Sequence, residues 1–362
     1  MNKIISFPHL GNYYHPISKL LKNLTKEKVI VAPPITKKTL EIGTKYSPDM
    51  VCIPFKYNLG NFIESLNNGA NILFTAGGGC RYRYYAEVTE TILKDLGYKF
   101  KLYKLIKTNR LRIKEVYHMF KEINPDLTYK DFFHHFLFGT IYLFYMDEID
   151  KIIRKNIGFE KVKGTHEKLQ KQMFKDFDKT NSIYKLTNLY KQYKRRFKQI
   201  KIDKPKKCLK VGIIGELYTS MEPFANYDLE KELAKEKIEV KRFTNLSYLL
   251  WQKKLLLNHM RRKVKKYCKY KLGADALDNI YRTLYLSKKK YDGIIHIKPF
   301  GCTPEITAIP IIQKICEEKE TPIIFFSYDE ESATEGIKTR LEAFKDLITI
   351  RRDSHEKSIF RN

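Results

Sequence analysis

The stretch that decides the fold runs from Gly293 to Ile312: Gly-Ile-Ile-His-Ile-Lys-Pro-Phe-Gly-Cys-Thr-Pro-Glu-Ile-Thr-Ala-Ile-Pro-Ile-Ile. Its apolar beginning, Ile294 to Ile297, predicts a buried strand, which we expect Lys-Pro-Phe-Gly to break. A helix should follow, with Thr303 as N-cap and Pro304 in the first turn, where the missing N–H costs nothing. Cys302 is thereby placed between a strand and a helix N-terminus, the edge at which open α/β sheets bind ligands.

The position of Cys302 supports two interpretations. The positive end of the following helix would lower the pKa of its thiol and favour the thiolate, which is the form that reacts and binds metals. Alternatively, Cys302 is only a small residue that fits a loop between a strand and a helix. The residues of this stretch alone leave both interpretations open.

The composition indicates a globular protein with an unusually basic surface. The chain has 362 residues, enough for two domains or for two domains and an insertion, and 43% of them are hydrophobic, an ordinary fraction for a packed core. The formal net charge of +28 would suit nucleic acid, an anionic membrane surface or a polyanionic ligand such as a coenzyme A ester. Because lysines are spread along the whole chain, we favour the simpler explanation of a solvated lysine-rich surface.

The apolar runs are too short for a membrane protein. After Lys3 the apolar run ends at Phe7, which is too short for a signal peptide. The longest apolar run, Phe132 to Tyr145, falls short of the roughly 20 residues that cross a bilayer. We therefore expect a soluble cytoplasmic protein, whose six cysteines are free or metal-bound rather than paired in disulfides. The phenylalanines of the long run should bury against protein, within the chain or at a dimer contact: Phe132, Phe133, Phe136, Phe138 and Phe144.

Strand-like and helix-like segments alternate in two regions of the chain. This order predicts a parallel sheet with helices on both faces in each region. The strand-like runs are 3–7, 29–32, 50–53, 71–76, 100–105, 209–215, 238–243, 294–297 and 322–327. The predicted fold class is α/β, with two Rossmann-like (flavodoxin-like) parallel-sheet domains and a helical insertion between them. The predicted parts are an N-terminal α/β domain (1–107), a helical region with a linker (108–207) and a C-terminal α/β domain (208–362).

Three cysteines share one local setting. Cys52, Cys80 and Cys302 each follow an apolar strand-like run and precede a helix, with Gly or Pro nearby. If the two α/β domains face each other, these loops can converge on one cleft, where three thiolates would suit a [4Fe–4S] cluster or a zinc ion. No Cys-x-x-Cys occurs, so the spacing by itself is a weak signal. The other cysteines lie within predicted elements and are interpreted as structural or incidental: Cys208, Cys268 and Cys316.

Several stretches carry a resemblance to a known family. They are Val31-Ala-Pro-Pro-Ile-Thr-Lys37, Tyr46-Ser-Pro-Asp-Met-Val-Cys-Ile-Pro-Phe-Lys56, Gly215-Glu-Leu-Tyr-Thr-Ser-Met-Glu-Pro-Phe-Ala-Asn226, Lys298-Pro-Phe-Gly-Cys-Thr-Pro304 and Ser327 to Phe344. The chain resembles the 2-hydroxyacyl-CoA dehydratase component family, and most closely its CoA protein activase and activase-related branch. The resemblance implies a [4Fe–4S] cluster held by three cysteines between Rossmann-like domains. Cys52 and Cys302 match directly, and Cys80 matches by position.

The same resemblance implies a function. The dehydratases of the family take one electron from an ATP-hydrolysing activator protein and dehydrate a 2-hydroxyacyl-CoA through a ketyl radical. We therefore expect an iron–sulfur protein for one-electron transfer to, or activation of, a CoA-ester-type substrate or a partner enzyme. Whether it is itself an (R)-2-hydroxyacyl-CoA dehydratase-type lyase or an ATP-dependent reductase component stays open, as do a CoA-ester ligand and dimerisation.

A rival hypothesis comes from the charge. The basic runs 194–198 and 261–266 have aromatic neighbours and could grip phosphates, as in a non-enzymatic α/β binding protein for nucleic acid or another polyanion. Most such runs are solvated helix faces, so we do not expect nucleic acid as a partner. No Gly-x-x-x-x-Gly-Lys-Ser/Thr is present, which leaves ATP binding by this chain without support.

A few polar residues near predicted strand ends complete the candidates. Glu216, Glu222 and Asn226 could line a cleft between domains, although we favour a role in helix capping. His296 alternates within a predicted strand, and we expect it to be a core residue with its hydrogen bonds satisfied.

Overall fold

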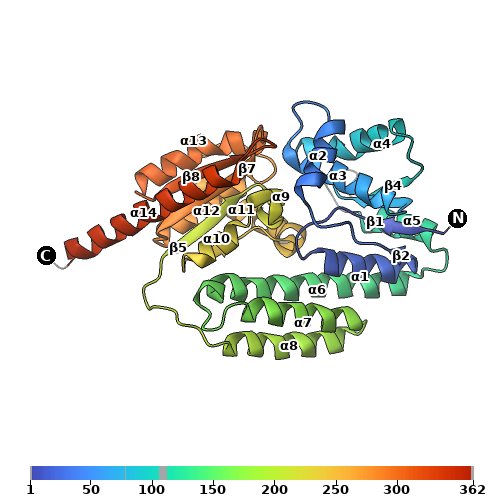
Figure 1. The fold of residues 1–362 in the computed structure, drawn as a ribbon, viewed down its shortest axis with the longest axis horizontal. Helices are drawn as coiled ribbons and strands as arrows, with labels where there is room; N and C mark the ends of the chain where they lie inside the picture. Colours follow the sequence, from blue (N-terminus) through green and yellow to red (C-terminus); the bar gives the residue numbers. More distant parts are fainter. Residues whose placement is uncertain (1, 78, 106–111, 360–362) are drawn as a thin grey trace. The chain divides into compact units, whose positions relative to one another are not determined.

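The computed structural model of the chain describes residues 2–77, 79–105 and 112–359, with side chains as far as Ser354. It divides into two compact units (Figure 1). The first consists of residues 1–146 and 168–196, and the second of residues 147–167 and 197–362. The helical region between the two sheets thus contributes residues to both units.

The first unit is built on a four-stranded parallel sheet of order β2-β1-β3-β4. Its strands are β1 (Ile4–Ser6), β2 (Lys28–Val29), β3 (Ile72–Thr75) and β4 (Lys101–Lys104). Its helices are α1 (Tyr14–Thr25), α2 (Lys37–Tyr46), α3 (Ile53–Asn67), the 3₁₀ turn η1 (Arg81–Tyr84), α4 (Tyr85–Asp95) and α5 (Ile113–Ile123). Thr36 caps α2, since its side chain accepts a hydrogen bond from the backbone N–H of Thr39.

Helices cover both faces of this sheet. Phe74 of β3 packs with Leu24 of α1 and Phe120 of α5. Its neighbour Leu73 packs on the opposite face, with Leu59 of α3 and other residues of α3 and α4. Successive side chains of a strand point to opposite faces, so both β3 residues are buried and the apolar run is continuous.

The structure corrects the prediction around Cys52. The run 50–53 is not a strand, and α3 (Ile53–Asn67) begins directly after Cys52. Pro54 stands in the first turn, where it does not interrupt a helix. Most of α3 is buried, so the amphipathic period that reveals a surface helix is lost. A Cβ on Gly60 would lie 2.0 Å from the carbonyl oxygen of Thr39, so glycine permits the close packing of α3 against α2.

Three long helices follow the first sheet: α6 (Tyr129–Asn156), α7 (Thr165–Lys179) and α8 (Ile183–Gln199), with η2 (Ile157–Phe159) after α6. Within the first unit they lie side by side (Figure 1). The ring of Tyr145 stacks on Tyr190 at 3.9 Å, and the hydroxyl of Tyr142 donates to Asp178 Oδ1 at 2.9 Å. In the part of the chain that is described, no helix combines the length and apolar character needed to cross a membrane.

The phenylalanines of α6 were predicted to bury within the chain or at a dimer contact, and the structure shows burial within the chain for some of them. Phe132 and Phe138 are fully buried, and Phe136 is half-buried. Phe133 and Phe144, in contrast, are 53% and 42% exposed. A helix of this length keeps one face away from the core it covers, and these two residues lie on that face.

The second unit repeats the strand order of the first. Its four-stranded parallel sheet has the order β6-β5-β7-β8, with β5 (Lys210–Gly215), β6 (Glu239–Arg242), β7 (Gly293–Pro299) and β8 (Ile323–Tyr328). Its short elements are α9 (Leu217–Met221), η3 (Phe224–Asn226), α10 (Leu229–Lys235) and the π-helical η4 (Tyr248–Gln252). Its longer helices are α11 (Lys253–Val264), α12 (Ala276–Lys288), α13 (Thr303–Glu318) and α14 (Thr334–Ile359). The α/β prediction of two parallel-sheet domains is therefore confirmed.

The two faces of the second sheet have separate cores. On one face, Leu233 of α10 and Phe344 of α14 pack with Val211 of β5. On the other, Leu284 of α12 and Ile312 of α13 pack with residues of β5 and β7. With helices on both faces, the ends of the strands are the edges of the sheet at which loops gather.

Candidate functional site at the carboxyl ends of the strands

Each sheet has a topological switch point. The first strand of each is central, since β1 lies between β2 and β3 and β5 lies between β6 and β7. The chain leaves to one side for the second strand and to the other for the third, so the loops that follow the first and third strands diverge. Cys80 follows β3 and Cys302 follows β7, so these two cysteines hold equivalent positions in the two sheets.

The loop that carries Cys302 differs from the prediction at both ends. Strand β7 continues through Pro299, and Cys302 itself, rather than Thr303, is the N-cap of α13. Pro299 is the last residue of its strand, where a missing donor is tolerated. Gly301 has a φ of 69°, which favours glycine, and this turn lets the N–H of Cys302 reach the carbonyl of Pro299 at 3.2 Å.

A buried polar network anchors the first turn of α13 behind Cys302. His296 Nε2 lies 2.7 Å from Glu305 Oε2, and Asn279 Nδ2 donates to both oxygens of Glu305 at 2.9 Å. The amide of Asn279 also bonds the backbone of Gly215, donating to its carbonyl at 3.1 Å and accepting from its N–H at 3.2 Å. The network therefore ties α13 to β7, to α12 and to the end of β5, which fixes the loop between β7 and α13.

The prediction for His296 is confirmed for one ring nitrogen only. His296 is completely buried, and Nε2 contacts Glu305. Its Nδ1 atom has no hydrogen-bond partner within the described chain. A buried polar atom left without a partner is costly and rare, so His296 is not simply a satisfied core residue.

Lys298 is a functional candidate that sequence reasoning missed. It lies on β7 four residues before Cys302 and is only 8% exposed. Its ammonium donates to Ser327 Oγ at 2.9 Å, at the end of β8. Burial lowers the pKa of Lys298, and the nearby Cys302 and Glu305 oppose that shift.

Among the residues after β5, Glu216 is the N-cap of α9, as predicted, whereas Glu222 and Asn226 make local hydrogen bonds in the turns that follow. The carboxylate of Glu216 accepts from the backbone N–H groups of Tyr218 and Thr219 at 3.0 and 2.8 Å. Burial raises the pKa of Glu216 to about 7, against the effect of these hydrogen bonds. Glu222 accepts from the N–H of Phe224 at 3.2 Å. Asn226 accepts from the N–H of Leu229 at 3.1 Å, just before α10. These side chains hold the loop that follows β5.

In the first unit, the segments that carry Cys52 and Cys80 touch each other. Cys52 is the N-cap of α3, and its Sγ lies 3.2 Å from the hydroxyl of Tyr85 at the start of α4. Tyr82, in the turn after Cys80, bonds through its hydroxyl to the side chain of Asn58 on α3. Burial, and then the proximity of Cys52, raise the pKa of Tyr85, so its hydroxyl stays protonated.

All three candidate cysteines are thus N-cap residues, of α3, of η1 and of α13. Cys80 is exposed, and Cys52 and Cys302 are half-buried. The remaining cysteines, Cys208, Cys268 and Cys316, are buried, and burial raises the pKa of Cys316 to about 12, as expected for packing residues. Accessible thiols beside helix N-termini are the donor type that binds iron–sulfur clusters, so the chemistry of the three residues fits such a group.

The described residues contain no group of three or more His, Cys, Asp or Glu side chains arranged to hold a metal ion. Cys52 and Cys80 belong to the first unit and Cys302 to the second. A site shared by the three thiols therefore stays a prediction.

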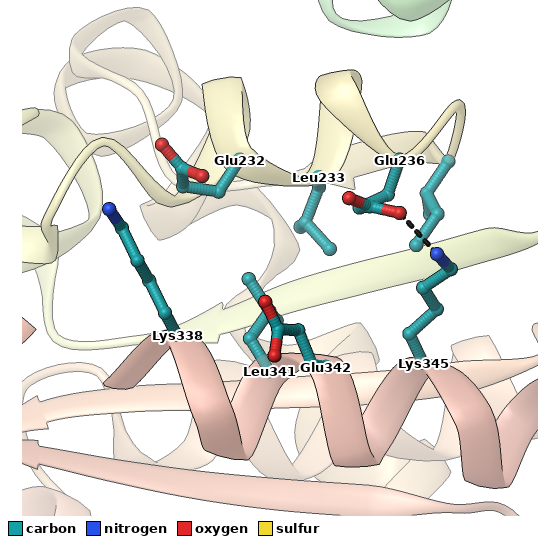
Figure 2. Close-up of a pocket in the computed structure, with 8 residues that line it drawn as sticks. Glu232, Leu233, Glu236, Lys338, Leu341, Glu342 and Lys345 are labelled. Atoms are coloured by element: carbon teal, nitrogen blue, oxygen red, sulfur yellow. Dashed lines mark hydrogen bonds and ion pairs between the residues drawn. The ribbon is translucent and has the colours of Figure 1, made fainter. Parts of the chain in front are cut away.

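A hollow elsewhere in the second unit offers no comparable chemistry. It measures about 230 Å³ and lies between α10 and α14 (Figure 2). Its rim is charged, with Glu236 paired to Lys345, and its floor is formed by Leu233, Ile238 and Leu341. Because it lies over a face of the sheet rather than at the carboxyl ends of the strands, we interpret it as a groove between two packed helices.

These observations define a class of protein: two parallel α/β units, each with a thiol after the third strand of its sheet. Comparison with sequence families then identifies one similarity. Residues 253–348 match the family described as 2-hydroxyglutaryl-CoA dehydratase, D-component. The matched stretch runs from the start of α11 through the Cys302 loop and into α14. No curated protein matches the chain.

Proposed function

We propose that the chain binds a [4Fe–4S] cluster through Cys52, Cys80 and Cys302 and works in one-electron transfer, as a relative of 2-hydroxyacyl-CoA dehydratase components in their activase-related branch. One observation carries the proposal. Cys302 lies within the stretch that matches the dehydratase D-component family, as the N-cap of α13 at the switch point of its sheet. Cys80 has the equivalent position in the other sheet, and Cys52 caps the helix that touches the Cys80 segment.

The residues of the chain have defined tasks in this proposal. The positive helix ends favour the thiolate at each cysteine, and the network of His296, Glu305 and Asn279 holds the Cys302 loop in place. A bound cluster would supply one-electron chemistry. The substrate class proposed is a CoA ester or a partner enzyme, and the partner is an ATP-hydrolysing activator protein in the cytoplasm. Whether the chain is itself a lyase or an accessory reductase component stays open.

Purification without oxygen tests the proposal. The full chain should be brown, contain iron and sulfide, and show the broad absorption near ~400 nm of thiolate-ligated clusters. Metal analysis should find iron rather than zinc, since three cysteines in one cleft could hold either. A colourless protein that stays free of iron after anaerobic reconstitution with iron and sulfide would refute the proposal.

The charge supports a second candidate function. A net charge of +28 and the basic runs on α8 and α11, with exposed residues such as Arg195 and Arg262, suit a binding protein for nucleic acid or another polyanion. A colourless protein that binds heparin supports this function over the first. Variants that lack some of these basic residues should then elute from heparin at a lower salt concentration than the unmodified chain.

A further inference from the structure

Two lysines of this lysine-rich chain are buried, which is unexpected. Lysine and arginine together number 69, and nearly all the described lysines are exposed or half-exposed. Among residues whose side chains are described, the buried lysines are Lys56 and Lys298, at 6% and 8% exposure. Burying an ammonium group is costly, so these two positions need a reason that the other lysines do not.

Each buried lysine lies four residues from a candidate cysteine in the sequence. Lys56 lies four residues after Cys52, one turn into α3. Lys298 lies four residues before Cys302, near the end of β7. Lys298 thus lies within the stretch that matches the dehydratase D-component family, whereas Lys56 lies in a segment that only resembles it.

Lys298 forms no ion pair within the described part of the chain. Its ammonium donates a hydrogen bond to the neutral hydroxyl of Ser327, and no carboxylate oxygen of the described residues lies within 4.0 Å of it. Glu305 is near, but its oxygens are occupied by His296 and Asn279. A buried cation without an ion pair is costly, so an anion close to Cys302 would lower that cost.

We propose that Lys298 is the fixed positive charge that balances the negative charge of the thiolate-ligated cluster and raises its reduction potential. The inference rests on the proposed function, since it needs a cluster bound at these cysteines. Reduction adds one electron from the donor protein and no proton, so the reduced state carries one more negative charge. A nearby cation stabilises that state more than the oxidised state. Lys298 tunes the potential as a fixed charge and is not a ligand.

The test compares reduction potentials of the full chain loaded with its cluster. Iron per chain is measured first, and dithionite is then added stepwise with redox mediators while the absorption near ~400 nm is followed. Lys298→Gln should keep its iron and shift the one-electron equilibrium toward the oxidised cluster at least tenfold, or ~59 mV. Lys298→Arg, which keeps the charge, and Lys314→Gln, an exposed position on α13, should stay within about threefold of the unmodified chain.

The outcomes separate the two proposals. Unchanged potentials in iron-loaded Lys298→Gln overturn the inference and leave the cluster standing. Absence of iron in the unmodified chain overturns both. If Lys298→Gln loses its iron, Lys298→Arg is the deciding variant. Retention of both iron and reduction potential in Lys298→Arg supports a role for the positive charge. Loss of iron equal to that of Lys298→Gln shows that Lys298 is needed only for packing and overturns the inference.

Discussion

The network behind Cys302 yields a quantitative prediction for stability. In Asn279→Ala, the buried N–H and C=O of Gly215 and the carboxylate of Glu305 each lose a hydrogen bond. A buried group left without its partner costs about 1–3 kcal/mol. Glu305 keeps His296, which offsets part of the loss, so we expect the free energy of unfolding of the second unit to fall by about 2–5 kcal/mol.

The chain carries its own probe for this measurement. Its single tryptophan, Trp251, lies in the second unit, so urea unfolding followed by tryptophan fluorescence reports on that unit. Lys288→Ala, at the exposed end of the same helix α12, is the matched control and should change the free energy by no more than about 0.5 kcal/mol. A loss below about 1 kcal/mol in Asn279→Ala would refute the argument that this network anchors α13.

Two further predictions concern Glu216 and the glycines. Burial raises the pKa of Glu216 from 4.5 to about 7, so the folded state binds its proton more tightly and loses stability as the pH rises through this window. Glu216→Gln should remove that loss between pH 4.5 and 7, and an unchanged pH dependence in urea unfolding would contradict the assignment. Gly60→Ala should destabilise the first unit by about 1–3 kcal/mol in thermal unfolding, because its methyl group would meet the backbone of Thr39. Gly336→Ala, on α14 with open space around it, should be neutral or stabilising by up to about 1 kcal/mol, and equal effects of the two changes would count against the close α2–α3 contact.

The alternation of strands and helices was predictable because parallel strands are short apolar runs between helical periods. The run Ile294–Ile297 and Pro304 placed β7 and α13 in the right order. The element boundaries around Cys302 were harder to predict, because the sequence does not distinguish a proline that ends a strand from a proline that interrupts one. The start of helix α3 was misplaced because burial on most sides erases its period.

The candidate site was predictable in part for a similar reason. Cys52, Cys80 and Cys302 could be selected because each lies near Gly or Pro at the start of a helix. Lys298 could not be selected from the sequence, because in a chain rich in lysine only its burial in the folded structure distinguishes it from the exposed lysines. The Glu305–Asn279 contact joins residues 26 positions apart and leaves no local pattern.

Iron content per chain for six Cys→Ser variants, purified without oxygen, tests the central claim most directly. Serine keeps the size of cysteine but is a poorer, harder ligand for iron. The account predicts that Cys52→Ser, Cys80→Ser and Cys302→Ser lower bound iron and bleach the absorption near ~400 nm, with the largest loss at Cys302, whereas the changes at the buried Cys208, Cys268 and Cys316 leave both intact. Full iron in Cys302→Ser together with lost iron in Cys316→Ser would contradict it.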